Sequence, residues 1–123
     1  MPSQHDDCLF CRLAHDGAHV ASTKGFVAIK DINPKAPVHL LIIPERHVDS
    51  FREIGEFPAH DVKRMLEFVA ETARDAGLED YRIEVNVGAP AGQTIFHLHW
   101  HLLGHRTAAH SDQAGDLTAV TEL

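Results

Sequence analysis

Residues 95–103 read Ile-Phe-His-Leu-His-Trp-His-Leu-Leu, with a histidine at every second position. Successive side chains of a β-strand point to opposite faces, so an extended segment places His97, His99 and His101 together on one face. The other face then receives Phe96, Leu98, Trp100 and Leu102. Because an unperturbed imidazole titrates near a pH of about 6.5, three of them side by side predict a site that binds a metal, moves a proton or attacks an electrophile.

Three interpretations of these histidines compete. Each buried ring nitrogen needs a hydrogen-bond partner, which disfavours a purely structural role for three histidines on one face. Alternate imidazoles on a strand can bind zinc. In the third interpretation the middle ring is a nucleophile and its neighbours hold the substrate. The preceding loop, Gly-Ala-Pro-Ala-Gly-Gln-Thr at 88–94, favours the third, because its backbone N–H groups could bind a phosphate or an oxyanion.

Outward from this segment, the chain alternates short apolar runs with turns. We expect strands at 19–22, 26–30, 39–43, 81–87 and 95–103, and a helical turn at 8–14. A long helix is predicted over 58–76, with an apolar stripe made by Val62, Met65, Leu66, Val69, Ala70 and Ala73. Gly77 suits the left-handed position after its end. The pattern predicts an α+β fold: an antiparallel sheet of about five strands, one long helix and a short N-terminal helix.

Composition restricts the class of protein. A chain of 123 residues with 44% hydrophobic and 24% charged residues suits one globular domain. The net charge of 11 − 18 = −7, without a basic run longer than two residues, argues against nucleic acid as a partner. No stretch approaches the roughly 20 apolar residues of a membrane span, and residues 1–7 lack an apolar signal region, so we expect a cytoplasmic protein. We expect two tails outside this domain. Residues 1–7 would be a flexible N-terminal tail, and residues 106–123 would be a C-terminal tail that could pack on a dimer partner.

Four separate motifs resemble those of one known family. His-Leu-His-Trp-His-Leu-Leu at 97–103 is similar to the signature of the histidine triad (HIT) superfamily of nucleotide hydrolases and transferases. The segment 31–47, Asp-Ile-Asn-Pro-Lys-Ala-Pro-Val-His-Leu-Leu-Ile-Ile-Pro-Glu-Arg-His, resembles the upstream block of that family. Asn86-Val-Gly88 and Gly92-Gln93-Thr94 resemble its phosphate loop. The resemblance covers about residues 8–105, as one HIT domain, and is greatest to the Hint-type nucleoside phosphoramidases.

The resemblance implies a catalytic mechanism. His99 would attack the α-phosphorus of a nucleoside 5′-phosphoramidate or an acyl-nucleotidylate and form a covalent nucleotidyl-histidine, which water then hydrolyses. His101 would contact the phosphate oxygens, and His97 and His39 would support the reacting ring. Since a charged imidazole cannot attack, His99 should be neutral, with its other nitrogen donating to a backbone carbonyl. The chemistry would need no cofactor.

The same resemblance implies binding sites for a purine nucleotide and a metal. Asn86, Gly92, Gln93 and Thr94 would hold the phosphate and leaving group, Asp31 the ribose hydroxyls, and Leu9, Phe10, Leu13, Ile29 and Ile32 the base. As in some HIT relatives, Cys8, Cys11, His47 and His97 would bind a structural Zn²⁺; otherwise the two cysteines are small buried apolar residues. A homodimer built through the long helix and one strand is also expected.

Other functions stay open at this point. The same nucleophile would serve a dinucleoside polyphosphate hydrolase or a nucleotidyltransferase. A nucleotide-binding scaffold without turnover is a further possibility, as is a metalloenzyme with His97, His99 and His101 as ligands. The segment after His105 lacks the Trp-Pro ending of some Hint proteins, which leaves the leaving group undetermined. Trp100 replaces a smaller aliphatic residue and is expected in the core or in a subunit interface.

Overall fold

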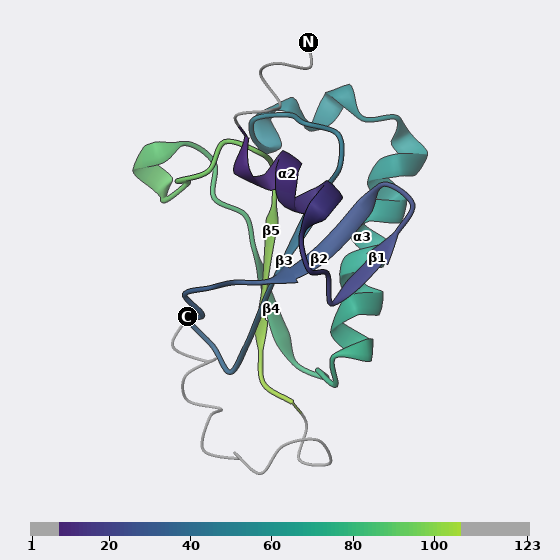
Figure 1. The fold of residues 1–123 in the computed structure, drawn as a ribbon, viewed down its shortest axis with the longest axis vertical. Coiled ribbons are helices and arrows are strands. Elements are labelled where there is room, and N and C mark those ends of the chain that lie inside the picture. The colour runs from purple at the N-terminus through teal and green to yellow at the C-terminus, as the bar shows by residue number, and fades with distance from the viewer. Residues whose placement is uncertain (1–7, 107–123) are drawn as a thin grey trace.

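The computed structural model describes residues 8–106, which form a five-stranded antiparallel sheet and its flanking helices (Figure 1). The elements in chain order are α2 (Leu9–Asp16), β1 (Ala21–Thr23), β2 (Phe26–Lys30), β3 (Val38–Pro44), the 3₁₀ helix η1 (Phe51–Glu56), α3 (Ala59–Asp75), β4 (Tyr81–Glu84), the 3₁₀ helix η2 (Ala89–Ala91) and β5 (Trp100–Gly104). The strand order in the sheet is β1-β2-β3-β5-β4. The predicted α+β class, the antiparallel sheet and both helices are confirmed.

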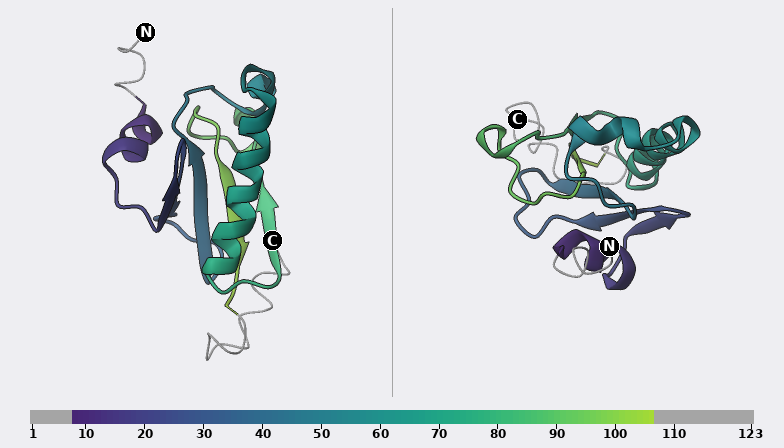
Figure 2. Two further views of the ribbon diagram at one scale, coloured as in Figure 1. Left: turned by 90° about the vertical axis from the view of Figure 1, so that its right-hand side faces the viewer. Right: turned by 90° about the horizontal axis from the view of Figure 1, so that it is seen from above.

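The two faces of the sheet carry different helices. Figure 2 shows α3 against one face and α2 against the other. Leu98, Trp100 and Leu102 join the cluster that packs under α3, as the alternation predicts. On the other side, His101 pairs in register with Leu41, a member of the cluster that contains Phe10 of α2. The histidines therefore lie on the α2 face, and the large apolar core lies on the α3 face.

The buried stripe of α3 differs from the predicted one. Met65, Val69 and Ala73 are buried as expected, together with Phe68 and Thr72. The prediction was wrong for two residues, because Leu66 is 46% exposed and Ala70 is also exposed. Phe68 turns the helix this way, since its ring stacks on Phe26 of β2 with 6.4 Å between centroids.

The strand bounds also needed correction at the histidine segment. Pairing of β5 begins only at Trp100, so residues 95–99 are irregular rather than part of a strand running from 95 to 103. The cause is a bond from Leu98 N–H to the carbonyl of Val48, which ties this segment to the chain after β3. Likewise β4 ends at Glu84 rather than at residue 87, and β1 covers 21–23 instead of 19–22.

The predictions for the tails at 1–7 and 106–123 lie outside the described residues, apart from Arg106. Between residues 8 and 106, none of the helices has the length and apolar character needed to cross a bilayer.

Candidate functional site

His99 is held as a neutral imidazole with one free nitrogen. Its Nδ1 lies 2.7 Å from the carbonyl oxygen of His97, and a carbonyl only accepts, so Nδ1 carries the hydrogen and Nε2 keeps its lone pair. The ring is 8% exposed and packs edge-on against Phe10, with 4.9 Å between centroids. Burial lowers the pKa of His99, against the opposite influence of the bond to His97. A neutral ring with a free nitrogen is what a histidine nucleophile requires.

His101 is connected to a second ring and a carboxylate. The backbone N–H of Lys35 donates to Nδ1 of His39 at 3.0 Å, so the hydrogen of the His39 ring is on Nε2. This Nε2 lies 2.9 Å from Nδ1 of His101 and 3.3 Å from Oδ2 of Asp31. His101 therefore accepts at Nδ1 and carries its own hydrogen on Nε2. Burial lowers the pKa of both His39 and His101, which favours the neutral form of each ring.

Within residues 8–106, two groups of side chains have ligand atoms close enough together to bind a metal ion: Cys8, Cys11, His47 and His97 in one, and Asp31, His39 and His101 in the other. The second fits poorly, since a metal at Nε2 of His39 would displace the hydrogen that the bond from Lys35 places there.

The Cys₂His₂ group fits a tetrahedral metal. Nδ1 of His97 lies 3.2 Å from Sγ of Cys8, 3.4 Å from Sγ of Cys11 and 3.2 Å from Nδ1 of His47. Ligands of a tetrahedral zinc ion are separated by about 3.3–3.8 Å, as its bond lengths require. The spacing of the cysteines is set by α2, because Cys8 caps the helix with its Sγ accepting from Cys11 N–H. The structure thus brings together the four residues that were predicted to form one group.

The remaining nitrogens of the two histidines orient these rings. Nε2 of His97 donates to the carbonyl of Pro44 at 2.8 Å, and Nε2 of His47 lies 3.1 Å from the carboxylate of Asp49. Such partners fix the tautomer and leave Nδ1 for a metal. Burial and the adjacent Cys8 raise the pKa of Cys11 to about 12, so a cation would be needed to ionise this thiol. The sequence analysis did not identify Asp49, although an acidic residue two positions after a candidate ligand was a usable signal.

The loop before the histidines depends on two glycines. Gly88 and Gly92 have φ of 88° and 99°, in the left-handed region. A Cβ at Gly92 would lie 3.2 Å from Nδ2 of Asn86, which donates to the carbonyl of Ala91 at 2.8 Å. Thr94 is exposed at the end of this loop. Asn86, Gly92 and Thr94 therefore lie in one accessible loop, as expected of residues that hold a phosphate.

Gln93 differs from these neighbours. It is 3% exposed, and both hydrogens of its amide are directed to backbone carbonyls, those of Asp49 and Ile95. No amide hydrogen remains for a phosphate oxygen, so the predicted contact of Gln93 with the phosphate is not supported by this geometry.

The residues predicted for the base are only partly brought together. Phe10, Leu13 and Ile29 share one apolar cluster on the α2 face. Leu9 and Ile32 lie outside this cluster and are 42% and 91% exposed. A cavity of about 380 Å³ borders Asp31 and His39, and Pro34, Pro37 and Thr72 also line it.

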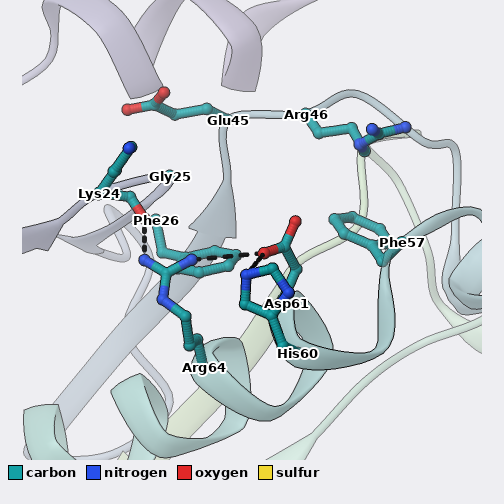
Figure 3. Close-up of a pocket in the computed structure, with 9 residues that line it drawn as sticks. All are labelled: Lys24, Gly25, Phe26, Glu45, Arg46, Phe57, His60, Asp61 and Arg64. Atoms are coloured by element: carbon teal, nitrogen blue, oxygen red, sulfur yellow. Dashed lines mark hydrogen bonds and ion pairs between the residues drawn. The ribbon is translucent and has the colours of Figure 1, made fainter.

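A larger cavity, of about 580 Å³, contains none of these residues (Figure 3). It lies between the β1–β2 turn, the end of β3 and the first turn of α3. Figure 3 shows Arg64 between the carbonyl of Lys24 and the carboxylate of Asp61, and Arg46 stands over the Phe57 ring at 5.7 Å. These guanidinium groups already have partners within the protein, so we assign this cavity no role.

Comparison with known proteins gives a consistent result. The model of the HIT domain family matches residues 13–108. A HIT-like protein of Chlamydia pneumoniae is 45% identical over 95 residues, which cover 74% of this chain and 84% of that protein. Protein HitA of Neisseria gonorrhoeae is 39% identical over 105 residues, covering 80% of this chain and 96% of its own. Cys8 and Cys11 precede the matched segment.

Solved structures give the same fold. A HIT family hydrolase from Clostridium thermocellum superimposes with a TM-score of 0.75 at 40% identity, over 80% of this chain and 90% of that one. A histidine triad protein from Clostridium difficile has a TM-score of 0.74 at 30% identity, over 82% and 92% of the two chains.

Proposed function

The chain belongs to the HIT domain family, and on that premise we propose that it hydrolyses nucleoside 5′-phosphoramidates or acyl-nucleotidylates at the α-phosphorus. The main support is the contact between Nδ1 of His99 and the carbonyl of His97, at 2.7 Å, which leaves Nε2 free to attack. The names of similar structures agree with this class of reaction, since proteins from Clostridium thermocellum and Legionella pneumophila are titled HIT family hydrolases.

The reaction proceeds in two displacements. Nε2 of His99 forms a bond to phosphorus, and the bond from phosphorus to the leaving nitrogen or oxygen breaks with its electron pair. The leaving group takes a proton from solvent, while Nε2–H of His101, oriented by the bond between its Nδ1 and His39, donates a hydrogen bond to a phosphate oxygen. Water next attacks the nucleotidyl-histidine, releases the nucleoside monophosphate, and restores His99 with its lone pair.

The substrate lies across the α2 face in this proposal. The phosphate is held at the loop by Asn86, Gly92 and Thr94, whose positions leave them open to solvent or half-buried. Asp31 accepts from the ribose hydroxyls with Oδ2, the oxygen that does not bind Asn33 N–H and that also lies 3.3 Å from Nε2 of His39. Ile32 offers the base a free apolar side chain beside it. A similar structure from Sulfolobus tokodaii, at 28% identity, is titled a histidine triad nucleotide-binding protein.

Cys8, Cys11, His47 and His97 bind a structural zinc ion in the same proposal, because two thiols and two imidazoles favour Zn²⁺ over harder cations. The ion would supply folding free energy and no chemistry. These ligands hold the start of α2 against residue 97, whose carbonyl orients the reacting ring.

The assembly we propose is a homodimer. β4 is an edge strand of the sheet, so its outer backbone groups are available for a second copy. Ile83 on this strand is 50% exposed and Leu66 on α3 is 46% exposed. A second copy seated over β4 and α3 would cover both side chains.

Turnover measurements test the proposal. The wild-type protein is assayed with adenosine and guanosine phosphoramidates and with dinucleoside polyphosphates. We expect phosphoramidate hydrolysis, and we expect His99→Ala to lose it while binding adenosine monophosphate with an unchanged Kd. Hydrolysis that persists in His99→Ala would refute the nucleophile. Hydrolysis of dinucleoside polyphosphates alone would favour the second enzymatic candidate, which uses the same residue.

A further inference from the structure

Gln93 makes three side-chain hydrogen bonds, all with backbone atoms. Its Oε1 accepts from Gly88 N–H at 2.9 Å, and its Nε2 donates to the carbonyls of Asp49 and Ile95 at 2.7 and 3.0 Å. Its own backbone N–H donates to the carbonyl of Gly88 at 3.1 Å. With a side chain 3% exposed, this amide is fixed in place at its contacts.

These bonds join three segments, of which segment 47–49 is distant in sequence from the other two. The first is the loop 88–92, and the second is the segment 47–49 that follows β3. The third is the start of the histidine segment at Ile95. Segment 47–49 begins with the metal-ligand candidate His47, whose Nε2 lies 3.1 Å from the carboxylate of Asp49. Gln93 is thus a direct side-chain connection between segment 47–49, which begins with His47, and the loop.

We propose that Gln93 is a positioning residue for the substrate phosphate: its buried amide holds loop 88–92 in register with segment 47–49, so that a change at His47 alters phosphate binding through Gln93. This inference rests on the proposed function, because it assumes that the loop receives the phosphate. It replaces direct contact between Gln93 and the phosphate with an action through the backbone of Gly88.

Substitution separates positioning from simple support of the fold. Gln93→Met keeps the length of the side chain and removes all three hydrogen bonds, so the loop loses its connection to segment 47–49. Ser50→Ala is the matched control, because Ser50 is also buried, lies beside Asp49, and bonds Arg52 N–H and Glu53 without touching the loop. Both variants should be destabilised, and only Gln93→Met should lose protection from hydrogen exchange at the Gly88 amide.

Binding of adenosine monophosphate, followed by calorimetry, is the main readout. We expect Gln93→Met to raise its Kd about tenfold and Ser50→Ala to leave it unchanged. His47→Ala should raise it about threefold, and the double variant His47→Ala/Gln93→Met should be no weaker than Gln93→Met alone. An additive effect, of about thirtyfold, would overturn the connection from His47 to the loop.

Two further results would count against the inference. A wild-type Kd in Gln93→Met, despite a lower stability, would show that the amide only supports the fold. If the wild-type protein binds no adenosine monophosphate, the proposed function fails. Without nucleotide binding, the proposed role of Gln93 in phosphate binding is rejected as well. Separately, if the hydrogen-exchange rate of the Gly88 amide is the same in Gln93→Met as in the wild type, the bond between Gln93 and Gly88 is rejected.

Discussion

If the proposed zinc ion is bound, removing it should lower the thermal stability of this protein by a large and predictable amount. The four ligand atoms lie within 4.8 Å of one another in the folded chain. The unfolded chain keeps only the Cys8-x-x-Cys11 pair close together, so zinc would bind the folded state preferentially. At free zinc about 1,000-fold above its Kd, this preference adds about 4.1 kcal/mol to the free energy of unfolding. For a folded body of about 100 residues, this corresponds to an increase in Tm of about 20 °C.

Scanning calorimetry with zinc and with a chelator measures this difference. In Cys11→Ala and His47→Ala the difference should disappear, because each loses a ligand atom of the set. His39→Gln is the control for the rival group of Asp31, His39 and His101, and it should keep the full difference. A zinc-dependent gain that survives Cys11→Ala, or that is lost in His39→Gln, would refute the assignment.

Four other measurements follow from the structure. Burial lowers the pKa of His39 and His101, so the unfolded chain binds protons more readily than the folded chain. In urea titrations of the chelated protein, the free energy of unfolding should therefore decrease as the pH is lowered through about 6.5. A free energy that does not change with pH would contradict this. Gly92→Ala places a side chain at φ 99° and should destabilise the protein by about 1–2 kcal/mol in the same assay. Leu102→Ala empties a fully buried site under α3 and should cost about 2–5 kcal/mol, measured as a lower urea midpoint. Ile83→Asp should convert the proposed dimer to monomers in sedimentation, and an unchanged mass would exclude β4 from the interface.

The sequence predicted the general architecture because side-chain periodicity depends on local geometry. Alternation around the histidines correctly separated Leu98, Trp100 and Leu102 from the rings. It could not locate the start of β5, because that start is set by a bond between Leu98 and Val48, fifty positions apart. The stripe of α3 was displaced for a similar reason, since the orientation of the helix depends on the contact of Phe68 with Phe26.

The site shows the same division between local and distant information. The resemblance to HIT relatives was enough to group Cys8, Cys11, His47 and His97, which the structure brings together. The role of Gln93 was not readable from its position beside two loop residues, because hydrogen-bond partners decide it and they come from Asp49 and Gly88. A glutamine in a glycine-rich loop has the same appearance in sequence whether its amide is exposed or fully bonded.

The main chain and the side chain of residue 97 make different contacts. Its ring faces the sulfur atoms, while its carbonyl receives the hydrogen of the neighbouring reactive imidazole. Every amino acid has a carbonyl, so replacing this histidine would remove one of the proposed metal ligands without deleting the acceptor that selects the tautomer. A substitution at residue 97 can therefore change the side chain and still leave His99 in the tautomer that the proposed reaction needs.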